Sequence, residues 1–412
     1  MSDPGRQIGP DRLGRYYTKA DIGHLLIDQM ANHTPSRLLD LGAGGGSLSS
    51  AAINRWSGIE VLTVDIDRAV SARLIKCFGG EGSFKHRHIQ ADALSDRLPD
   101  LIFAKVDQID TAVCNPPFIV PKWRKGFAQI LEETGFSGCI PVVGDVDAAL
   151  LFLAQNLRLL SNQATLGIIL PDSLISATRY RRFRKELLQR YKVHKAIRLP
   201  RGSFSGTDAL ASIVIISKGS STETTIKLSK LRDGRELEPE LLVDIDEAVT
   251  RLDFDYHAQR LKGSRLGREP AVLGSIVSEL KRGSVSSSEA RAGDVPIFHT
   301  SDMSLSLSGE WCDLGRFSQV SGELDGVIRA QPGDILVARV GRNLERKVLG
   351  VLKGSPFLTD CVYRIQVPEH YRDRVLAQLS CADGQAWLAS RAYGVGAKQL
   401  TKADLLTFPL CL

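Results

Sequence analysis

The segment TAVCNPPF, residues 111–118, is a short apolar run that ends in an amide, two prolines and an aromatic ring. The apolar start of this run predicts a buried β-strand. Proline fixes φ and lacks an N–H donor, so Pro116 and Pro117 stop the strand and prevent a helix from starting at once. We therefore expect a turn here, at the carboxyl edge of an open α/β sheet, where such sheets hold their ligands.

The expected turn exposes three groups that suit one planar amino group. The Asn115 side-chain oxygen and the Pro116 carbonyl can each accept an N–H bond, and the Phe118 ring can stack on the plane that carries the amino group. An ordinary Asn-Pro turn after a strand is the alternative, because such pairs are common in turns. Motifs elsewhere in the chain favour the functional interpretation.

Three motifs that suit a nucleotide-like cofactor precede this turn. Residues 37–56, RLLDLGAGGGSLSSAAINRW, predict a strand that ends at Asp40, a glycine-rich turn and a helix. The glycines let the backbone pass close to a ligand, whose anionic part can meet the free N–H groups of the helix. The next strand ends at Asp65, where a carboxylate can bind both hydroxyls of a ribose. A third strand, near residues 87–90, leads to Asp92, which could accept from the amino group of an adenine.

The order of these motifs carries a resemblance. They would also suit a dinucleotide, but the dehydrogenase fingerprint G-x-G-x-x-G requires glycine at position 47, where this chain has Ser47. Glycine turn, ribose carboxylate, adenine carboxylate and NPPF together resemble the S-adenosylmethionine-dependent adenine-N6 DNA methyltransferases that carry a C-terminal target recognition domain. The resemblance implies an α/β fold with a seven-stranded, mostly parallel Rossmann-like sheet and an antiparallel hairpin at one edge. It also implies S-adenosyl-L-methionine as the cofactor and a target adenine that is flipped out of the duplex.

The resemblance implies the site residues as well. GRYYT, residues 14–18, resembles the segment that caps the amino-acid end of the cofactor, although Lys19 replaces the usual proline. No metal is implied. The predicted residues are Asn115, Pro116, Pro117 and Phe118 for catalysis, Thr18, Asp40, Gly42, Gly44, Asp65, Ile66, Asp92 and Ala93 for the cofactor, and Phe118 and Phe204 for stacking on the target base.

Basic residues recur in stretches that could meet DNA phosphates. Residues 119–145 predict a basic, loop-like connection that ends at a helix near Val146, and residues 179–185 place five basic residues on one predicted helix. A solvated helix face or an insertion without function is the alternative. The predicted DNA contacts are Lys122, Arg124, Arg181, Arg182, Lys281, Arg282, Arg339 and Arg342.

The second half of the chain predicts a separate domain. Residues 226–270 are polar and acidic and predict a linker region, made of a small β-unit and a helix, after a methyltransferase domain at 1–225. Residues 271–412 alternate short strands, glycine turns and a late helix, which resembles one target recognition module of the specificity subunits of type I restriction systems. This resemblance implies an α+β DNA-binding domain.

Composition sets the remaining expectations. The 412 residues are 43% hydrophobic and 24% charged, with a net charge of +6 and seven cysteines that form no C-x-x-C pair. This suits reduced thiols in a globular cytoplasmic protein. No apolar run is long enough for a membrane span, and the N-terminal residues show no signal peptide.

These observations predict a site-specific enzyme that methylates N6 of adenine in double-stranded DNA, within a restriction-modification or related defence system. Its candidate partners are a cognate restriction endonuclease or a specificity subunit, with no membrane partner. An RNA or protein-glutamine N-methyltransferase of the same core is one alternative. A non-catalytic DNA-specificity protein is another.

Overall fold

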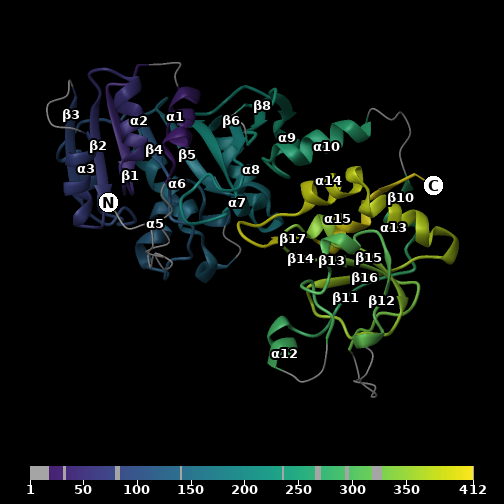
Figure 1. Cartoon of the computed structure of the whole chain (residues 1–412). Helices are drawn as coiled ribbons and strands as arrows, with labels where there is room; N and C mark the ends of the chain where they lie inside the picture. The colour runs from purple at the N-terminus through teal and green to yellow at the C-terminus, as the bar shows by residue number, and fades with distance from the viewer. Residues whose placement is uncertain are drawn as a thin grey trace, which may run out of the picture. The chain divides into compact units, whose positions relative to one another are not determined.

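The computed structural model describes residues 18–30, 34–78, 84–139, 142–233, 236–264, 271–292, 297–317 and 327–411. The chain forms two compact units, Met1–Phe254 and Asp255–Leu412 (Figure 1). No helix among the described residues combines the length and apolar character that a membrane crossing requires.

A nine-stranded sheet organises the described part of the first unit, in the order β3-β2-β1-β4-β5-β7-β6-β8-β9. Neighbours from β3 to β5 are parallel, whereas β7 is antiparallel to both β5 and β6. The large, mostly parallel sheet expected from the sequence is thereby confirmed. The strands are β1 (Arg37–Leu41), β2 (Glu60–Asp65), β3 (Lys85–Gln90), β4 (Thr111–Cys114), β5 (Thr165–Pro171), β6 (Lys192–Arg198), β7 (Ala211–Ser217), β8 (Thr225–Lys230) and β9 (Leu241–Asp244).

The sheet is wider than predicted, because β8 pairs parallel with β6 and β9 pairs antiparallel with β8. The antiparallel hairpin β6–β7 is therefore not at the edge. Both added strands lie between residues 225 and 244, at the start of the predicted linker region, and the first unit extends to residue 254. In β8, buried Ile226 and Leu228 flank exposed Lys227, and this period-2 pattern of a half-buried strand is hidden by the polar average of the stretch.

Nine helices are described for this unit: α1 (Ala20–Gln29), α2 (Ser47–Arg55), α3 (Ala69–Phe78), α4 (Leu98–Phe103), α5 (Lys125–Glu133), α6 (Ala148–Leu159), α7 (Asp172–Ser176), α8 (Arg181–Arg190) and α9 (Ile245–Ala248). Helix α5 lies where a loop was predicted. Its Phe127, Ile130 and Leu131 are buried at spacings of three and four residues, so one face packs on the unit. Helix α6 begins close to the predicted position, and its N-cap Asp147 accepts from the Ala149 N–H at 3.0 Å.

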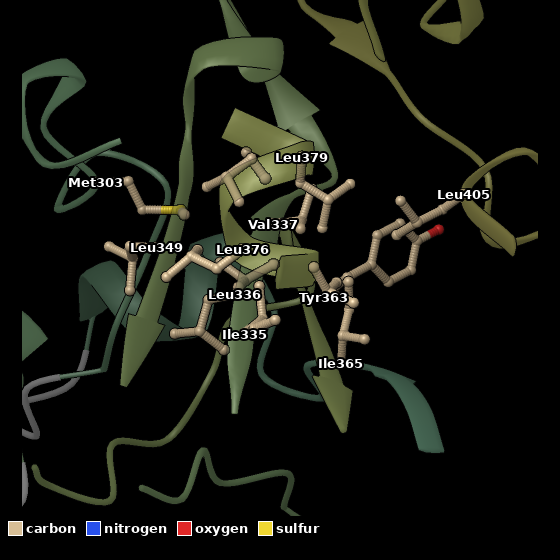
Figure 2. Close-up of a cluster of buried hydrophobic side chains, with 14 of the residues drawn as sticks. Met303, Ile335, Leu336, Val337, Leu349, Tyr363, Ile365, Leu376, Leu379 and Leu405 are labelled. Carbon is tan, nitrogen blue, oxygen red and sulfur yellow. The ribbon is translucent and has the colours of Figure 1, made fainter. Parts of the chain in front are cut away.

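The described part of the second unit contains a separate five-stranded sheet in the order β11-β16-β13-β15-β12. Leu336 and Val337 of β13 and Leu376 and Leu379 of α13 belong to one buried cluster (Figure 2). The strands are β10 (Ala271–Val272), β11 (Glu279–Arg282), β12 (Trp311–Asp313), β13 (Ile335–Ala338), β14 (Val340–Gly341), β15 (Val348–Lys353), β16 (Val362–Gln366), β17 (Lys398–Gln399) and β18 (Pro409–Leu410), and the helices are α10 (Phe254–Ser264), α11 (Leu273–Ile276), α12 (Ser287–Ala292), α13 (Arg372–Ser380), α14 (Ala382–Arg391) and α15 (Lys402–Leu406).

Candidate active site

A cavity of about 1030 Å³, its open mouth included, lies at the carboxyl ends of strands β1 to β4. Because these strands are parallel, the segments that follow them meet at one edge of the sheet. All eight predicted cofactor-binding residues line this cavity, as do Asn115 and Pro117 of the NPPF turn. Pro116 and Phe118 belong to the same turn but are not among its lining residues.

The glycine turn between β1 and α2 has a backbone that needs glycine. Gly42 has φ = 77°, Gly44 has φ = 51° and Gly46 has φ = 76°, all in the left-handed region. A Cβ on Gly46 would come within 2.6 Å of the Leu74 side chain, and one on Gly42 within 3.3 Å of the Phe152 ring. The turn therefore follows the wall of the cavity with no room for side chains at these two positions.

Asp65, at the end of β2, is 4% exposed and is held by the backbone on both carboxylate oxygens. The Gly44 N–H donates to Oδ2 at 2.9 Å, and the Asp67 N–H donates to Oδ1 at 2.9 Å. A carboxylate offers about four acceptor sites, so two remain for the hydroxyls of a ribose.

Asp40, at β1, is buried and 2% exposed. Ser49 of α2 donates its hydroxyl to Oδ2 at 2.6 Å. Burial raises the pKa of the Asp40 carboxyl to about 7, a shift that the Ser49 hydrogen bond opposes and the negative charge of Asp65 increases. Near neutral pH this side chain therefore exchanges between the neutral and charged forms.

Asp92, after β3, accepts from the Leu94 N–H at 2.9 Å and pairs with the Arg124 guanidinium at 2.6 Å. The Arg124 guanidinium also lies over the Phe127 ring, 4.7 Å from its centroid. Arg124 was predicted to contact DNA, but the structure pairs it with a carboxylate of the cofactor cavity. It thus connects the segment after the NPPF turn to the cavity wall.

The NPPF turn contacts two segments far away in the sequence. Asn115 Nδ2 donates to Thr18 Oγ1 at 2.9 Å, and the Thr18 backbone forms an isolated antiparallel bridge with Phe204. The Phe204 ring meets the Phe118 ring edge to face, with centroids 6.0 Å apart and planes at 81°. Residues 14–17 of the predicted capping segment lie outside the described residues.

The aromatic pair differs from the predicted arrangement. A base held between two rings needs them parallel and roughly 7 Å apart, twice the contact distance between carbon atoms. Phe204 is instead only 2% exposed and directs its edge contact at Phe118. The prediction that Phe118 and Phe204 stack on opposite faces of one base therefore does not hold for this conformation.

Sequence reasoning missed several lining residues. Phe152 of α6 and Ile119 after the NPPF turn line the cavity, and Ser49 binds Asp40 from inside α2. Phe152 lies in a helix that is apolar on nearly every side, so no periodicity separated it from ordinary core residues.

Most predicted DNA contacts are exposed, as such contacts require. Arg282 is exposed but pairs with Asp360. Arg339 contradicts the prediction, because it is only 8% exposed and donates from Nε to the Asp360 carbonyl at 2.5 Å. Its guanidinium is used inside the second unit. Lys281 is exposed and pairs with Glu279 at 2.6 Å, and the remaining exposed candidates are Lys122, Arg181, Arg182 and Arg342.

The fold and the cavity define a Rossmann-like methyltransferase domain, and comparison with known proteins agrees. Residues 81–240 match the family model of the N-6 DNA methylases, and residues 17–131 match that of the methyltransferase small domain. The resemblance to N-6 DNA methylases expected from the sequence is confirmed over these residues. The cofactor of the domain is S-adenosylmethionine.

Two curated relatives are similar to parts of the chain. A tRNA1(Val) (adenine(37)-N6)-methyltransferase of Flavobacterium psychrophilum is 26% identical over 147 residues, which are 34% of this chain and 55% of that protein. A putative type II restriction enzyme and methyltransferase of Methanocaldococcus jannaschii is 30% identical over 115 residues, 23% of this chain and 10% of that protein. The chain therefore spans less than two thirds of either relative.

One solved structure is similar in fold over nearly the whole chain. The type IIG restriction endonuclease BpuSI aligns with 98% of this chain and 59% of its own chain, with a TM-score of 0.52 and 14% sequence identity. At this identity the likeness concerns the fold alone.

The residues of the cavity fit S-adenosylmethionine. Asp65 has acceptor capacity for the ribose, and Ile66, 54% exposed, offers an apolar side chain at the cavity wall together with Ala93. An exposed isoleucine at this position is what an adenine ring would cover. The Thr18 hydroxyl lines the same cavity and could donate to the carboxylate of the cofactor.

Proposed function

We propose that this protein is a site-specific DNA methyltransferase that acts on N6 of adenine in double-stranded DNA. The observation that carries the proposal is the position of Asn115, which lines the same cavity as the glycine turn, Asp65 and Asp92. The match of residues 81–240 to the N-6 DNA methylases supports the choice of an amino group on adenine.

The chemistry needs two acceptors more than it needs a base. The exocyclic nitrogen of adenine is a poor nucleophile, because its lone pair is delocalised into the ring. Hydrogen bonds from this amino group to Asn115 Oδ1 and the Pro116 carbonyl would draw the nitrogen toward tetrahedral geometry and stabilise the positive charge that develops on it. Bound S-adenosylmethionine supplies an electrophilic methyl group on a sulfonium. No strong general base is required.

The target adenine must leave the duplex to reach such a cavity, which costs a few kcal/mol of unstacking. Stacking on Phe118 and phosphate contacts could offset this cost. Exposed Lys122 follows the NPPF turn, and exposed Arg181 and Arg182 begin α8. We propose that these three residues contact phosphates, which attract basic side chains whatever the base sequence.

The second unit is proposed as the target recognition domain. Its exposed Lys281 on β11 and Arg342 next to β14 are candidate DNA contacts. The M. jannaschii relative is named as a restriction enzyme and methyltransferase, and BpuSI is a restriction endonuclease. These names support the proposal that the protein acts in a restriction-modification or related defence system, with a cognate nuclease or a specificity subunit as partner.

Transfer RNA is the second candidate substrate. It is favoured by the F. psychrophilum relative, which is named as a tRNA adenine-N6-methyltransferase. The cavity does not distinguish the two substrates, because the amino group is the same in both nucleic acids.

Methylation in a cell tests the proposal most directly. The protein is expressed in a host without adenine methylation, and the host DNA is sequenced by a method that detects N6-methyladenine. The wild type should mark one sequence context, and Asn115→Ala should leave the DNA unmarked. Purified protein is then given methyl-labelled S-adenosylmethionine with duplex DNA or transfer RNA. Label in RNA alone favours the second candidate, and label in neither, despite cofactor binding, overturns both.

A further inference from the structure

We infer that Thr18 is a positioning residue through which the bound cofactor sets the orientation of the Asn115 amide. The inference rests on the proposed function and deepens it. Its basis is the hydrogen bond from Asn115 Nδ2 to Thr18 Oγ1 at 2.9 Å, in which two residues 97 positions apart meet in the wall of one cavity.

The orientation of this amide decides whether it can accept a hydrogen bond from the target amino group. The oxygen and nitrogen ends of an asparagine amide have nearly the same size, so a half-turn exchanges them with little steric change. Only Oδ1 can accept from the amino group of adenine, and an inverted amide would present a donor to a donor. With Nδ2 bonded to Thr18, Oδ1 lies on the side of the amide away from Thr18, and this oxygen is buried.

A hydroxyl alone does not fix the amide, because it can donate or accept. The Thr18 hydroxyl has one proton. If that proton is donated to an anion in the cavity, only the lone pairs of Oγ1 remain for Asn115. The amide must then present Nδ2 to Thr18, and Oδ1 is held on the opposite side.

Strand order indicates which anion takes the proton. The sheet order β3-β2-β1-β4 places Asp92, Asp65, Asp40 and Asn115 successively along the cavity edge. Thr18 is bonded to Asn115 and therefore lies at the β4 end, away from Asp65 and Asp92. The carboxylate of S-adenosylmethionine is repelled by these acidic side chains, so the β4 end, with the Thr18 hydroxyl, is the favourable place for it.

The inference separates two roles of Thr18. If Thr18 only binds the cofactor, Thr18→Val raises the KM for S-adenosylmethionine and leaves kcat unchanged at saturation. If Thr18 also orients Asn115, kcat itself falls, by roughly tenfold for the loss of one orienting hydrogen bond. Thr18→Ser keeps the hydroxyl and should restore kcat.

The kinetic experiment uses the full chain and genomic DNA from an unmethylated host. Wild type, Thr18→Val and Thr18→Ser are compared at saturating S-adenosylmethionine, and again with its decarboxylated form as methyl donor. Without the carboxylate, the wild type should fall to the kcat of Thr18→Val, and the substitution should have no further effect. Thr18→Ser is compared in the same way, so that the effect of the carboxylate is also measured in a variant that keeps the hydroxyl.

A spectroscopic measurement tests, without turnover, whether the bound cofactor orients the Asn115 amide through Thr18. The side-chain amide signal of Asn115 is identified in ¹⁵N spectra by its loss in Asn115→Ala. S-adenosylhomocysteine, which keeps the carboxylate, should shift this signal and slow its exchange with water in the wild type and Thr18→Ser, but not in Thr18→Val. If Thr18→Val keeps the wild-type kcat and its Asn115 signal shifts as much as in the wild type, the inference on Thr18 is overturned and the proposed function stands. A wild type that does not methylate DNA overturns the proposed function itself.

Discussion

Asp40 should make the first unit less stable as the pH rises. Its carboxyl has an ordinary pKa of 3.8 and a pKa of about 7 in the fold, raised by burial. The folded state therefore disfavours the charged form. This penalty is absent below pH 4, grows between pH 4 and pH 7, and is complete above pH 7.

The size of the effect follows from the two pKa values. A difference of about three between them corresponds to about 4 kcal/mol in full, of which about 2.5 kcal/mol accrues between pH 5 and pH 8. Asp40→Asn removes the titration while keeping an oxygen that can accept from Ser49. The free energy of unfolding of the variant, relative to that of the wild type, should therefore rise by about 2.5 kcal/mol from pH 5 to pH 8. This rise does not depend on how the two proteins compare at pH 5.

Native-state hydrogen exchange of peptides from β1 is a suitable assay, because a chain of two units does not unfold in one transition. Wild type and variant are compared at each pH without cofactor, which cancels the intrinsic pH dependence of exchange. Asp107→Asn, a change at an exposed position, provides the baseline. If the difference in free energy of opening between Asp40→Asn and the wild type changes by less than about 0.5 kcal/mol from pH 5 to pH 8, the reasoning on Asp40 is refuted.

Four further substitutions test individual assignments. Asn115→Ala should lower kcat about 100-fold or more while the Kd of S-adenosylhomocysteine, measured by calorimetry, changes only a few-fold; wild-type turnover would contradict the mechanism. Asp65→Ala should weaken cofactor binding at least tenfold by the same measurement, and a defect confined to kcat would argue against a ribose contact. Arg339→Ala should lower the melting temperature of the second unit, because it removes a guanidinium, only 8% exposed, that bonds Asp360, whereas Lys281→Ala should lower DNA affinity and its salt dependence without changing that temperature. If Arg339→Ala instead lowers DNA affinity and leaves the melting temperature unchanged, Arg339 is a DNA contact as first predicted.

The cofactor side of the site could be predicted because it depends on strand ends. Asp65 ends its strand and Asp40 lies one residue before the end of β1, while Asp92 and Asn115 follow two more parallel strands. Parallel strands bring their carboxyl ends to one edge, so a prediction of strands and their order also predicts which residues meet there. No knowledge of side-chain contacts is required for that step.

Features set by side-chain contacts were beyond the sequence. An arginine has the same letter in the sequence whether its side chain is exposed or buried. Nothing in the residues around Arg339 indicates that its guanidinium binds a carbonyl inside the second unit. Arg184 of α8 behaves alike: it was counted in a basic helix face, but it is fully buried and donates to the Val249 carbonyl at 3.0 Å. Charge along a helix predicts a surface only when the core face is already known.

The target side of the site combines both situations. Asn115 and Phe118 could be placed by the strand that precedes them, whereas Thr18 and Phe204 reach them from a segment before α1 and from the β6–β7 connection. The contacts form a series in which Asn115 binds Thr18, Thr18 pairs with Phe204, and Phe204 packs on Phe118. The ring that is proposed to stack on the target base thus contacts Phe204, whose backbone pairs with that of Thr18. We therefore expect entry of a target base at Phe118 to affect Thr18, the residue inferred above to orient the Asn115 amide.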